Sequence, residues 1–259
     1  MEGMELLLRR RFLLDRPTMG TWLTLADPAV AEIMAAAGFE WLVVDLEHSL
    51  LTLETAGELI RVIELCGVSP LVRLTSNDSD QIKRVMDGGA HGIIVPMVLS
   101  ADDAAKAVAA TRYPPAGTRG VGLGRAQRYG AGFEEYLSWQ VDGPIIIVQI
   151  EHRDSVANLE AILAVPGIGG FIIGPYDLSA SMGIPGQFDD PVFLECMETI
   201  RSTARRMGVP SGIHLVEPDV AALRQAVADG YSLIAYGVDF RFLDVTARLG
   251  VSAMRELLS

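Results

Sequence analysis

The chain contains, in its middle, the stretch Ile145-Ile146-Ile147-Val148-Gln149-Ile150-Glu151-His152, which decides its fold. The first six positions form a nearly continuous apolar run rich in β-branched residues. Such a run, without polar alternation, is typical of a strand covered on both faces, as in a parallel sheet. Polar residues follow directly at its carboxyl end. The stretch therefore predicts a buried parallel strand that delivers polar side chains to one edge of the sheet.

Seven further runs of this kind occur along the chain, each followed by a turn and an amphipathic stretch. They span residues 21–25, 41–44, 71–74, 92–96, 171–174, 211–215 and 233–238. Between them, apolar residues repeat at helical spacing in the sets Val30/Ile33/Met34/Ala37, Ala56/Leu59/Ile60/Ile63, Ile82/Val85/Met86 and Val220/Leu223/Val227. Strands that alternate with helices imply right-handed crossovers and a parallel sheet.

The length of the chain favours one closed architecture over an open sheet. Its 259 residues are close to the roughly 250 that a single (β/α)₈ barrel needs, and they contain eight strand–helix units. No linker or shift in composition divides them. We therefore predict an α/β fold, a (β/α)₈ TIM barrel, as a single domain over residues 1–259.

The composition excludes several classes of partner. Lys and Arg total 21 against 33 Asp and Glu, a formal net charge of −12, which repels nucleic acids and anionic membranes. No apolar run reaches the roughly 18 residues of a transmembrane helix. Two cysteines, Cys66 and Cys196, make no disulfide framework, and Met1 to Pro17 is typical of a short surface helix rather than a signal peptide. A cytoplasmic location is expected.

The longest irregular segment is predicted between residues 113 and 142. It holds five glycines and three arginines. Loops of this length are usually lids or interface elements, or else disordered. The glycines match neither a phosphate-binding loop nor a dinucleotide fingerprint, because no Gly-Lys-Ser/Thr follows and no strand leads directly into them.

Charged and polar residues gather at the carboxyl side of the apolar runs. The groups in question are Asp45-Leu46-Glu47-His48, Arg73, Gln149-Ile150-Glu151-His152, Gly174-Pro175-Tyr176-Asp177 and Asp239. In a barrel, the carboxyl ends of all strands open onto the same face, where catalytic residues are found. We therefore expect these side chains to converge on one pocket.

Glu151 and Asp177 follow neighbouring predicted strands and form a candidate metal site. Hard cations such as Mg²⁺ prefer carboxylate oxygens and keep other positions open for water or substrate. The alternative is that each carboxylate caps the helix that follows it, which is plausible for Asp177 before Leu178-Ser179-Ala180. Position along the chain does not separate the two interpretations.

Asp45 and His48 form an Asp-x-x-His pair, and Arg73 lies inside an apolar strand. A carboxylate that binds one imidazole nitrogen raises the basicity of the other, although a histidine at the rim of a helix start is the alternative. A buried guanidinium needs an anion. That anion is either a substrate carboxylate or enolate, or the carboxylate of Asp45 or Glu47 in a structural ion pair.

Taken together, these segments resemble the HpcH/HpaI family of class II pyruvate aldolases over nearly the whole chain. The matching motifs are Gly20-Thr21-Trp22, Gly38-Phe39-Glu40-Trp41, Asp45-x-Glu47-His48, Val72-Arg73 with Asn77-Asp78, Arg112-Tyr113-Pro114-Pro115-Ala116-Gly117-x-Arg119-Gly120, Val148-Gln149-Ile150-Glu151, Gly174-Pro175-x-Asp177-Leu178-Ser179 and Gly237-Val238-Asp239.

The resemblance implies a metal-dependent aldolase that cleaves 4-hydroxy-2-keto acids to pyruvate and an aldehyde. It implies a divalent cation (Mg²⁺, Mn²⁺ or Co²⁺) at Glu151 and Asp177, and a homo-oligomer, a trimer or hexamer, whose C-terminal helix is exchanged between subunits. The remaining roles that it implies are an acid/base pair of His48 with Asp45, enolate stabilisation by Arg73, and a substrate site formed by Gln149, Gly174, Tyr176, Asp177 and Trp22.

Other functions remain open at this level. An oxaloacetate-type decarboxylase would use the same enolate chemistry without His48 as a base, and a barrel that only binds a 2-keto acid would need no base at all. No lysine stands at the strand ends, which argues against a Schiff-base mechanism, and no Gly-x-Ser-x-Gly elbow supports a serine hydrolase. Leu46 and Tyr176 depart from the smaller residues usual in the family, and both are expected to reshape the substrate pocket.

Overall fold

The computed structural model describes residues 16–259 and contains a closed barrel of eight parallel strands in chain order, with β8 paired back to β1. The predicted TIM barrel is confirmed. The strands are β1 (Thr18–Leu23), β2 (Trp41–Asp45), β3 (Ser69–Arg73), β4 (Gly92–Val95), β5 (Ile145–Ile150), β6 (Ile168–Ile173), β7 (Ser211–Leu215) and β8 (Leu233–Val238).

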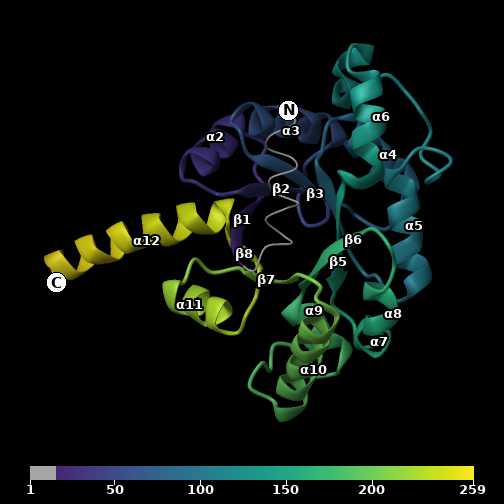
Figure 1. Cartoon of the computed structure of the whole chain (residues 1–259). Coiled ribbons are helices and arrows are strands. Elements are labelled where there is room, and N and C mark those ends of the chain that lie inside the picture. The colour runs from purple at the N-terminus through teal and green to yellow at the C-terminus, as the bar shows by residue number, and fades with distance from the viewer. Residues whose placement is uncertain (1–15) are drawn as a thin grey trace.

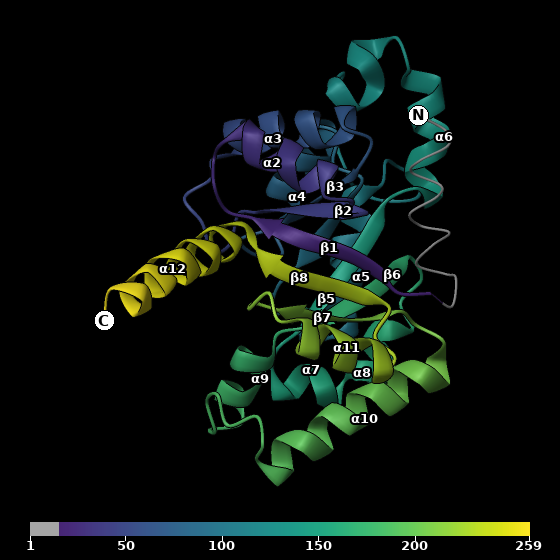
Figure 2. The same ribbon diagram turned by 90° about the vertical axis from the view of Figure 1, so that its left-hand side faces the viewer.

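Helices surround the barrel, as Figures 1 and 2 show. They are α2 (Pro28–Ala36), α3 (Leu53–Leu65), α4 (Ser79–Asp87), α5 (Ala101–Thr111), η1 (Arg125–Gly130), α6 (Phe133–Asp142), α7 (Arg153–Ala157), α8 (Leu159–Leu163), α9 (Pro175–Ser181), α10 (Pro191–Met207), α11 (Val220–Ala228) and α12 (Asp239–Leu258). The proposed surface helix over Met1 to Pro17 lies almost entirely outside the described residues.

Three strands match their predicted bounds, whereas β1 and β6 begin three residues earlier than predicted. In β1 the early part pairs with β8, Thr18 opposite Leu233, and in β6 it pairs with β5, Ile168 opposite Ile146. Glycines separate the apolar residues of these parts from the main runs, Gly20 in β1 and Gly169 and Gly170 in β6, so the apolar run is not continuous there. Backbone hydrogen bonds to the neighbouring strand extend the sheet there regardless of side chain.

Two apolar layers hold the barrel together. The inner one fills the barrel itself with residues such as Trp41, Ile147 and Leu233. The outer one packs the strands against the helices, and it includes the whole predicted stripes of α3 and α4. Each strand is therefore covered on both faces, which is why its sequence is apolar throughout.

The predicted stripes of α2 and α11 are wrong in part. Ile33 is 63% exposed, and Val220 is 55% exposed, while Ala31 and Ala226 are buried in their place. Both helices flank the start of α12, which leaves the barrel instead of packing along it (Figures 1 and 2). The apolar side chains that the pattern assigned to the core thus face outward.

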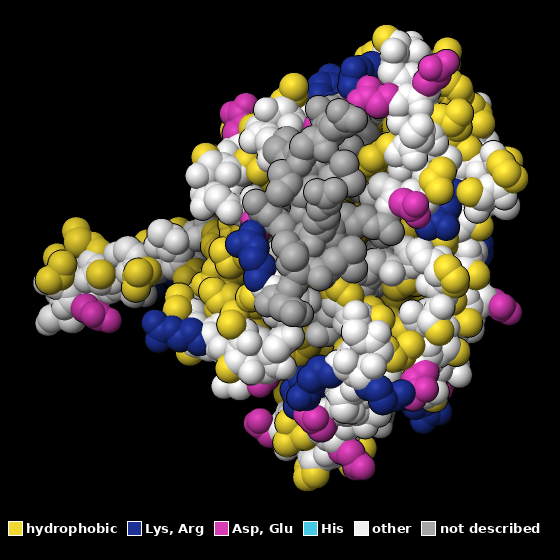
Figure 3. Space-filling view, in the orientation of Figure 1, with side chains coloured by type: hydrophobic (Ala, Val, Ile, Leu, Met, Phe, Trp, Pro, Cys, Tyr) yellow, Lys and Arg dark blue, Asp and Glu magenta, His cyan; other side chains and the backbone are white. Residues whose placement is uncertain are grey.

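Helix α12 extends away from the barrel and exposes an apolar face. Asp239 is its only buried residue. Apolar side chains recur along it at helical spacing, at Leu243, Val251, Met254 and Leu258, and each is at least half exposed. Hydrophobic side chains are visible along this helix in Figure 3. Within residues 16–259, no helix combines the length and apolarity that membrane crossing requires.

The segment between β4 and β5 is more ordered than predicted, because α6 occupies Phe133–Asp142. Its irregular part is held by Arg119, which is buried and donates to the carbonyl of Thr111 and to the hydroxyls of Tyr113 and Tyr136. An ion pair with Asp87 at 3.2 Å completes its contacts. The arginine therefore ties this segment to α4 and α5.

Asp239, expected in the pocket, instead binds the backbone that follows β1. Its carboxylate accepts hydrogen bonds from the N–H groups of Thr24, Leu25 and Phe240, at 2.7 to 2.8 Å, and from the Thr24 hydroxyl. The side chain is fully buried. It therefore closes the barrel by joining the ends of β8 and β1.

We predict that Asp239→Ala lowers the free energy of unfolding by more than about 3 kcal/mol, because it leaves several buried donors without an acceptor. Urea denaturation measures the loss. Asp244→Ala on the same helix removes only surface ion pairs with Arg241 and Arg248 and should change the midpoint little. Equal midpoints for the two variants would contradict the role of Asp239.

Candidate active site

Arg73, at the end of β3, is the centre of the charged cluster at the barrel mouth. Its Nε and Nη2 donate to the two carboxylate oxygens of Asp45, at 2.8 and 2.6 Å. Its Nη1 lies 3.3 Å from Glu47 Oε2. The guanidinium also stacks on Trp22, 4.3 Å from the ring centroid. A structural ion pair with Asp45 is thus present, and one edge of the guanidinium faces Glu47.

Asp45 does not contact the ring of His48. Its carboxylate is occupied by Arg73 and by the backbone N–H groups of Glu47 and His48. The His48 ring is exposed, and its Nε2 lies 3.8 Å from Glu47 Oε2. Within one chain, the carboxylate nearest to the imidazole is therefore Glu47. Asp45 orients the loop and the arginine.

Glu47 is a site residue that sequence reasoning did not assign, although it lies in the Asp45-x-Glu47-His48 motif. Burial raises the pKa of Glu47 to about 7; Arg73 opposes the rise, and Asp45 and Asp177 add to it by repulsion. Glu47 therefore lies close enough to Asp177, which follows β6, to be repelled by its charge. The available signal was its place in the motif, between Asp45 and His48, together with a buried arginine in the next strand that needs anionic partners.

Glu151 follows β5 and is buried. One oxygen, Oε1, accepts from the backbone N–H of Met97 at 2.7 Å, and the other accepts from the side-chain amide of Gln149. Burial raises the pKa of Glu151 to about 7. The hydrogen bond from Met97 lowers this pKa, and repulsion from Glu47 and Asp177 raises it further. Four carboxylates, Asp45, Glu47, Glu151 and Asp177, therefore lie in one region where Arg73 is the cation that binds two of them, an arrangement that a further cation would stabilise.

Neither Glu151 nor Asp177 caps a helix. The cap of α7 is His152, whose Nδ1 accepts from the N–H of Asp154. Helix α9 begins after Gly174, with no side-chain cap, and Asp177 lies inside its first turn. No described residue donates a hydrogen bond to the Asp177 carboxylate. The capping alternative is thus contradicted for both residues.

Gly174 lies so close to the Glu151 side chain that no side chain of its own would fit there. A Cβ on Gly174 would lie 3.0 Å from Glu151 Oε2 and 3.3 Å from Gln149 Nε2, tighter than most real contacts. Among residues 16–259, no group of three or more His, Cys, Asp or Glu side chains is arranged to hold a metal. A cation at Glu151 and Asp177 would therefore take its other ligands from water or substrate, as Mg²⁺ commonly does.

Trp22 on β1 and His214 on β7 pack against each other near the charged cluster. Their ring centroids lie 5.0 Å apart. His214 Nε2 lies 3.2 Å from the carbonyl oxygen of Gly237, which also accepts from the Thr21 hydroxyl. Gly237 has a φ of +69°, a conformation that favours glycine, and it sits where the β1–β8 register shifts.

The two departures from the family pattern differ in position. Leu46 is buried in the outer apolar layer, so the expectation that it reshapes the pocket is contradicted. Tyr176, in the first turn of α9, is 62% exposed. Its ring lies next to Gly186, where an added Cβ would be 3.4 Å from the ring. Tyr176 remains at the rim of the mouth.

Burial of His214 makes the chain sensitive to acid. Burial lowers its pKa from the ordinary 6.5 to about 4, assisted by Arg73. Protons therefore bind the unfolded chain more readily, and stability is lost as pH falls from about 6.5 towards 4. We predict that His214→Phe loses less stability than the parent over this range, by at most about 3 kcal/mol. Urea denaturation at pH 7 and pH 4.5 tests it; parallel losses would contradict it.

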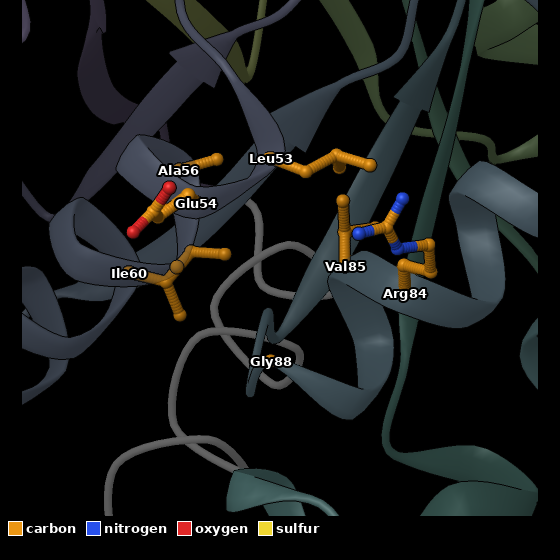
Figure 4. A pocket seen from close by; sticks show the side chains of 8 residues that line it. Leu53, Glu54, Ala56, Ile60, Arg84, Val85 and Gly88 are labelled. Atoms are coloured by element: carbon orange, nitrogen blue, oxygen red, sulfur yellow. The ribbon is translucent and has the colours of Figure 1, made fainter.

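A separate pocket lies outside the barrel, between α3 and α4 (Figure 4). Leu53, Ile60 and Val85 supply apolar walls, and Glu54 and Arg84 are its charged lining residues. No residue of the charged cluster lines it. The candidate active site is therefore the barrel mouth.

Comparison with known proteins identifies the family of this chain. The model of the HpcH/HpaI aldolase/citrate lyase family matches residues 18–244. The 4-hydroxy-2-oxo-heptane-1,7-dioate aldolase of Salmonella typhimurium is 41% identical over 243 residues, 91% of each chain.

Solved structures show the same fold. An HpcH/HpaI aldolase/citrate lyase family protein from Burkholderia cenocepacia superposes with a TM-score of 0.91 at 33% identity, covering 96% of this chain and 98% of that one. The citrate lyase beta subunit of M. tuberculosis, complexed with oxaloacetate and magnesium, shares the fold alone, with a TM-score of 0.59, 16% identity and coverage of 87% and 93%. The predicted family and its class of carbon–carbon lyases are confirmed, and the chain belongs to the HpcH/HpaI aldolase/citrate lyase family.

Proposed function

We propose that this chain is a metal-dependent class II aldolase that cleaves, or forms, 4-hydroxy-2-keto acids through a pyruvate enolate. The observation that carries the proposal is the buried carboxylate of Glu151, which is repelled by the charges of Glu47 and Asp177, at the same end of the barrel as the Arg73–Asp45 pair. An anion-stabilising arginine and a cation site at one barrel mouth suit a reaction in which negative charge develops on an enolate.

Glu151 and Asp177 are the residues that we propose hold the cation, Mg²⁺, Mn²⁺ or Co²⁺. When bound, a divalent cation supplies Lewis-acid stabilisation of the keto oxygen. Met97 and Gln149 hold the Glu151 carboxylate in place through their hydrogen bonds. This second layer of contacts is what orients a metal ligand.

The other residues bind substrate and move the proton. We propose that the His48 imidazole removes the proton from the 4-hydroxyl, with Glu47 as its nearest carboxylate, so that the C3–C4 bond breaks. Arg73 offsets the charge left on the enolate. The pyruvate carboxylate is held by backbone N–H groups near Gly174, Tyr176 and Asp177, and Gln149 and Trp22 complete the substrate site.

The test is pyruvate formation from a panel of 2-keto-3-deoxy sugar acids and other 4-hydroxy-2-keto acids, with and without Mg²⁺, Mn²⁺ or Co²⁺. We expect turnover that disappears on chelation and returns with the ion. Metal-dependent exchange of the pyruvate methyl protons should accompany it. Oxaloacetate decarboxylation without any aldol cleavage, retained in His48→Ala, would replace the proposal by a decarboxylase.

We also propose that the chain works as a homo-oligomer, a trimer or hexamer, in which α12 packs against a partner subunit. Its apolar face lies away from its own barrel, and Ile33 and Val220 on the flanking helices are exposed. An apolar surface of this extent is unusual on a monomer. The oligomer is proposed to act in the cytoplasm on small-molecule substrates, with no nucleic acid or membrane as partner.

We predict that Met254→Glu dissociates this assembly, because it places a carboxylate in a buried apolar contact. Light scattering should give a multiple of the 27.9 kDa chain for the parent and a smaller particle for the variant. Arg248→Glu, on another face of α12, makes a larger change of charge, from +1 to −1, and should leave the mass of the parent. A monomeric parent would contradict the proposal.

A further inference from the structure

His214 presents a hydrogen-bond acceptor that nothing else in the described chain uses. The Gly237 carbonyl has no proton to donate, so the contact at 3.2 Å requires the proton on His214 Nε2. In the neutral ring the other nitrogen, Nδ1, then carries a lone pair. No described residue donates a hydrogen bond to Nδ1. The barrel thus sets the tautomer and leaves an acceptor free.

The free acceptor lies on β7, two strands away from β5, which carries Glu151 at its end. The proposed cation ligands follow β5 and β6, and Arg73 ends β3. His214 ends β7 and is linked to Arg73 through Trp22, which contacts both side chains. On this side Asp239 is taken up by backbone hydrogen bonds. With the keto-acid half of the substrate near Glu151, as proposed above, we place its other half towards His214.

The chemistry of this side suits a hydroxyl group rather than a carboxylate. His214 Nδ1 only accepts, and the indole N–H of Trp22, which has no acceptor among the described residues, only donates. A hydroxyl can both donate and accept, whereas a carboxylate has no proton for Nδ1. The partly buried ring has its pKa lowered to about 4 by desolvation, so near pH 7 it offers a carboxylate no positive charge.

We infer that His214 Nδ1 accepts a hydrogen bond from a hydroxyl on the aldehyde half of the substrate, so that the enzyme selects hydroxylated aldehydes over their deoxy counterparts. This inference rests on the proposed aldolase function and adds the class of aldehyde to it. His214 is then a specificity-determining residue, and it takes no part in breaking the C3–C4 bond.

The test compares two aldehydes that differ by one hydroxyl, glycolaldehyde and acetaldehyde, in aldol addition to pyruvate. The ratio of their kcat/KM values is measured in the parent, in His214→Phe and in His214→Gln. Phe keeps a ring against Trp22 but has no acceptor, and Thr21 still donates to the Gly237 carbonyl. Gln keeps one donor and one acceptor. We expect the parent to favour glycolaldehyde, Phe to lower the ratio about tenfold, and Gln to keep most of it.

An unchanged ratio in His214→Phe would overturn the inference, and so would a parent that prefers acetaldehyde or the carboxylate-ended 4-oxobutanoate. If the Phe variant does not fold, the same ratio of kcat/KM values is measured in His214→Leu and compared with that of the parent. Exchange of pyruvate methyl protons, measured without aldehyde, distinguishes failure of the proposed aldolase function from failure of the proposed role of His214. No exchange in the parent refutes the aldolase itself; exchange with an unmoved ratio refutes only the role of His214.

Discussion

Glu151→Gln is expected to lower pyruvate formation about a thousandfold or more, the largest effect of any single substitution proposed for this chain. Gln keeps an oxygen to accept from the Met97 N–H but loses the charge that would hold a cation. Loss of a group that stabilises developing charge costs roughly 10² to 10³ in rate, and loss of the metal costs more. Steady-state cleavage of a 4-hydroxy-2-keto acid measures the effect.

Titration with Mn²⁺ gives a second, independent readout of the same substitution. Binding should weaken at least tenfold in Glu151→Gln and stay unchanged in Glu160→Gln. Glu160 is an exposed glutamate of α8 whose partner is Arg206, so it reports any general effect of removing a charge. Parent turnover that survives chelation, or normal turnover in Glu151→Gln, would refute the metal role.

Arg73→Met is expected to lower pyruvate proton exchange by roughly 10² to 10³, because it removes the cation that faces the enolate. The substitution also strands Asp45, whose carboxylate is buried and held by two guanidinium hydrogen bonds. Removing one member of a buried ion pair costs about 3 to 5 kcal/mol. Activity must therefore be measured well below the melting temperature of the variant.

Arg16→Met is the matched control for this prediction. Arg16 forms an exposed ion pair with Glu40 at 2.9 Å, and its loss should change neither exchange nor the melting temperature appreciably. A folded Arg73→Met variant that exchanges pyruvate methyl protons at the parent rate would make Arg73 purely structural. A second substitution, Asp45→Asn, should restore stability to Arg73→Met without restoring exchange.

The strands could be predicted closely because burial on both faces leaves a direct mark on the sequence. Residues 145–150, 211–215 and 233–238 are strands with the predicted bounds. The helices α3 and α4 bury their whole predicted stripes. In these elements continuous or periodic apolarity corresponds to burial in the core, so the apolar pattern is enough to predict the element.

The helices beside α12 show where the pattern fails. Ile33 in α2 and Val220 in α11 belong to apolar stripes at helical spacing, yet both lie at the surface. Periodicity identifies an apolar face of a helix but does not show which part of the protein packs against it. The proposed cover is another copy of the chain. Helix α6 was missed for a different reason, since the glycines and arginines before it read as a continuing loop.

In the candidate site, too, some features could be predicted from the sequence and others could not. Residue types and their place after the strands were enough to indicate Arg73, Glu151 and Asp177, because all strand ends of a barrel open on one face. The hydrogen-bond and ion-pair partners of each carboxylate could not be predicted from the spacing of residues in the sequence. Asp45 lies three residues from His48, but its oxygens bind Arg73, 28 positions away, while Glu47 lies closer to the imidazole.

The sequence by itself determined the barrel, its family and the set of ionisable groups at its mouth. Tertiary structure alone decided what each group binds: Asp239 joins β8 to β1, Leu46 packs in the outer layer, and His214 turns one nitrogen to the Gly237 carbonyl and leaves the other free. The physical reason is that apolarity and strand order are local properties, whereas a hydrogen bond depends on two atoms that only the closed barrel brings together.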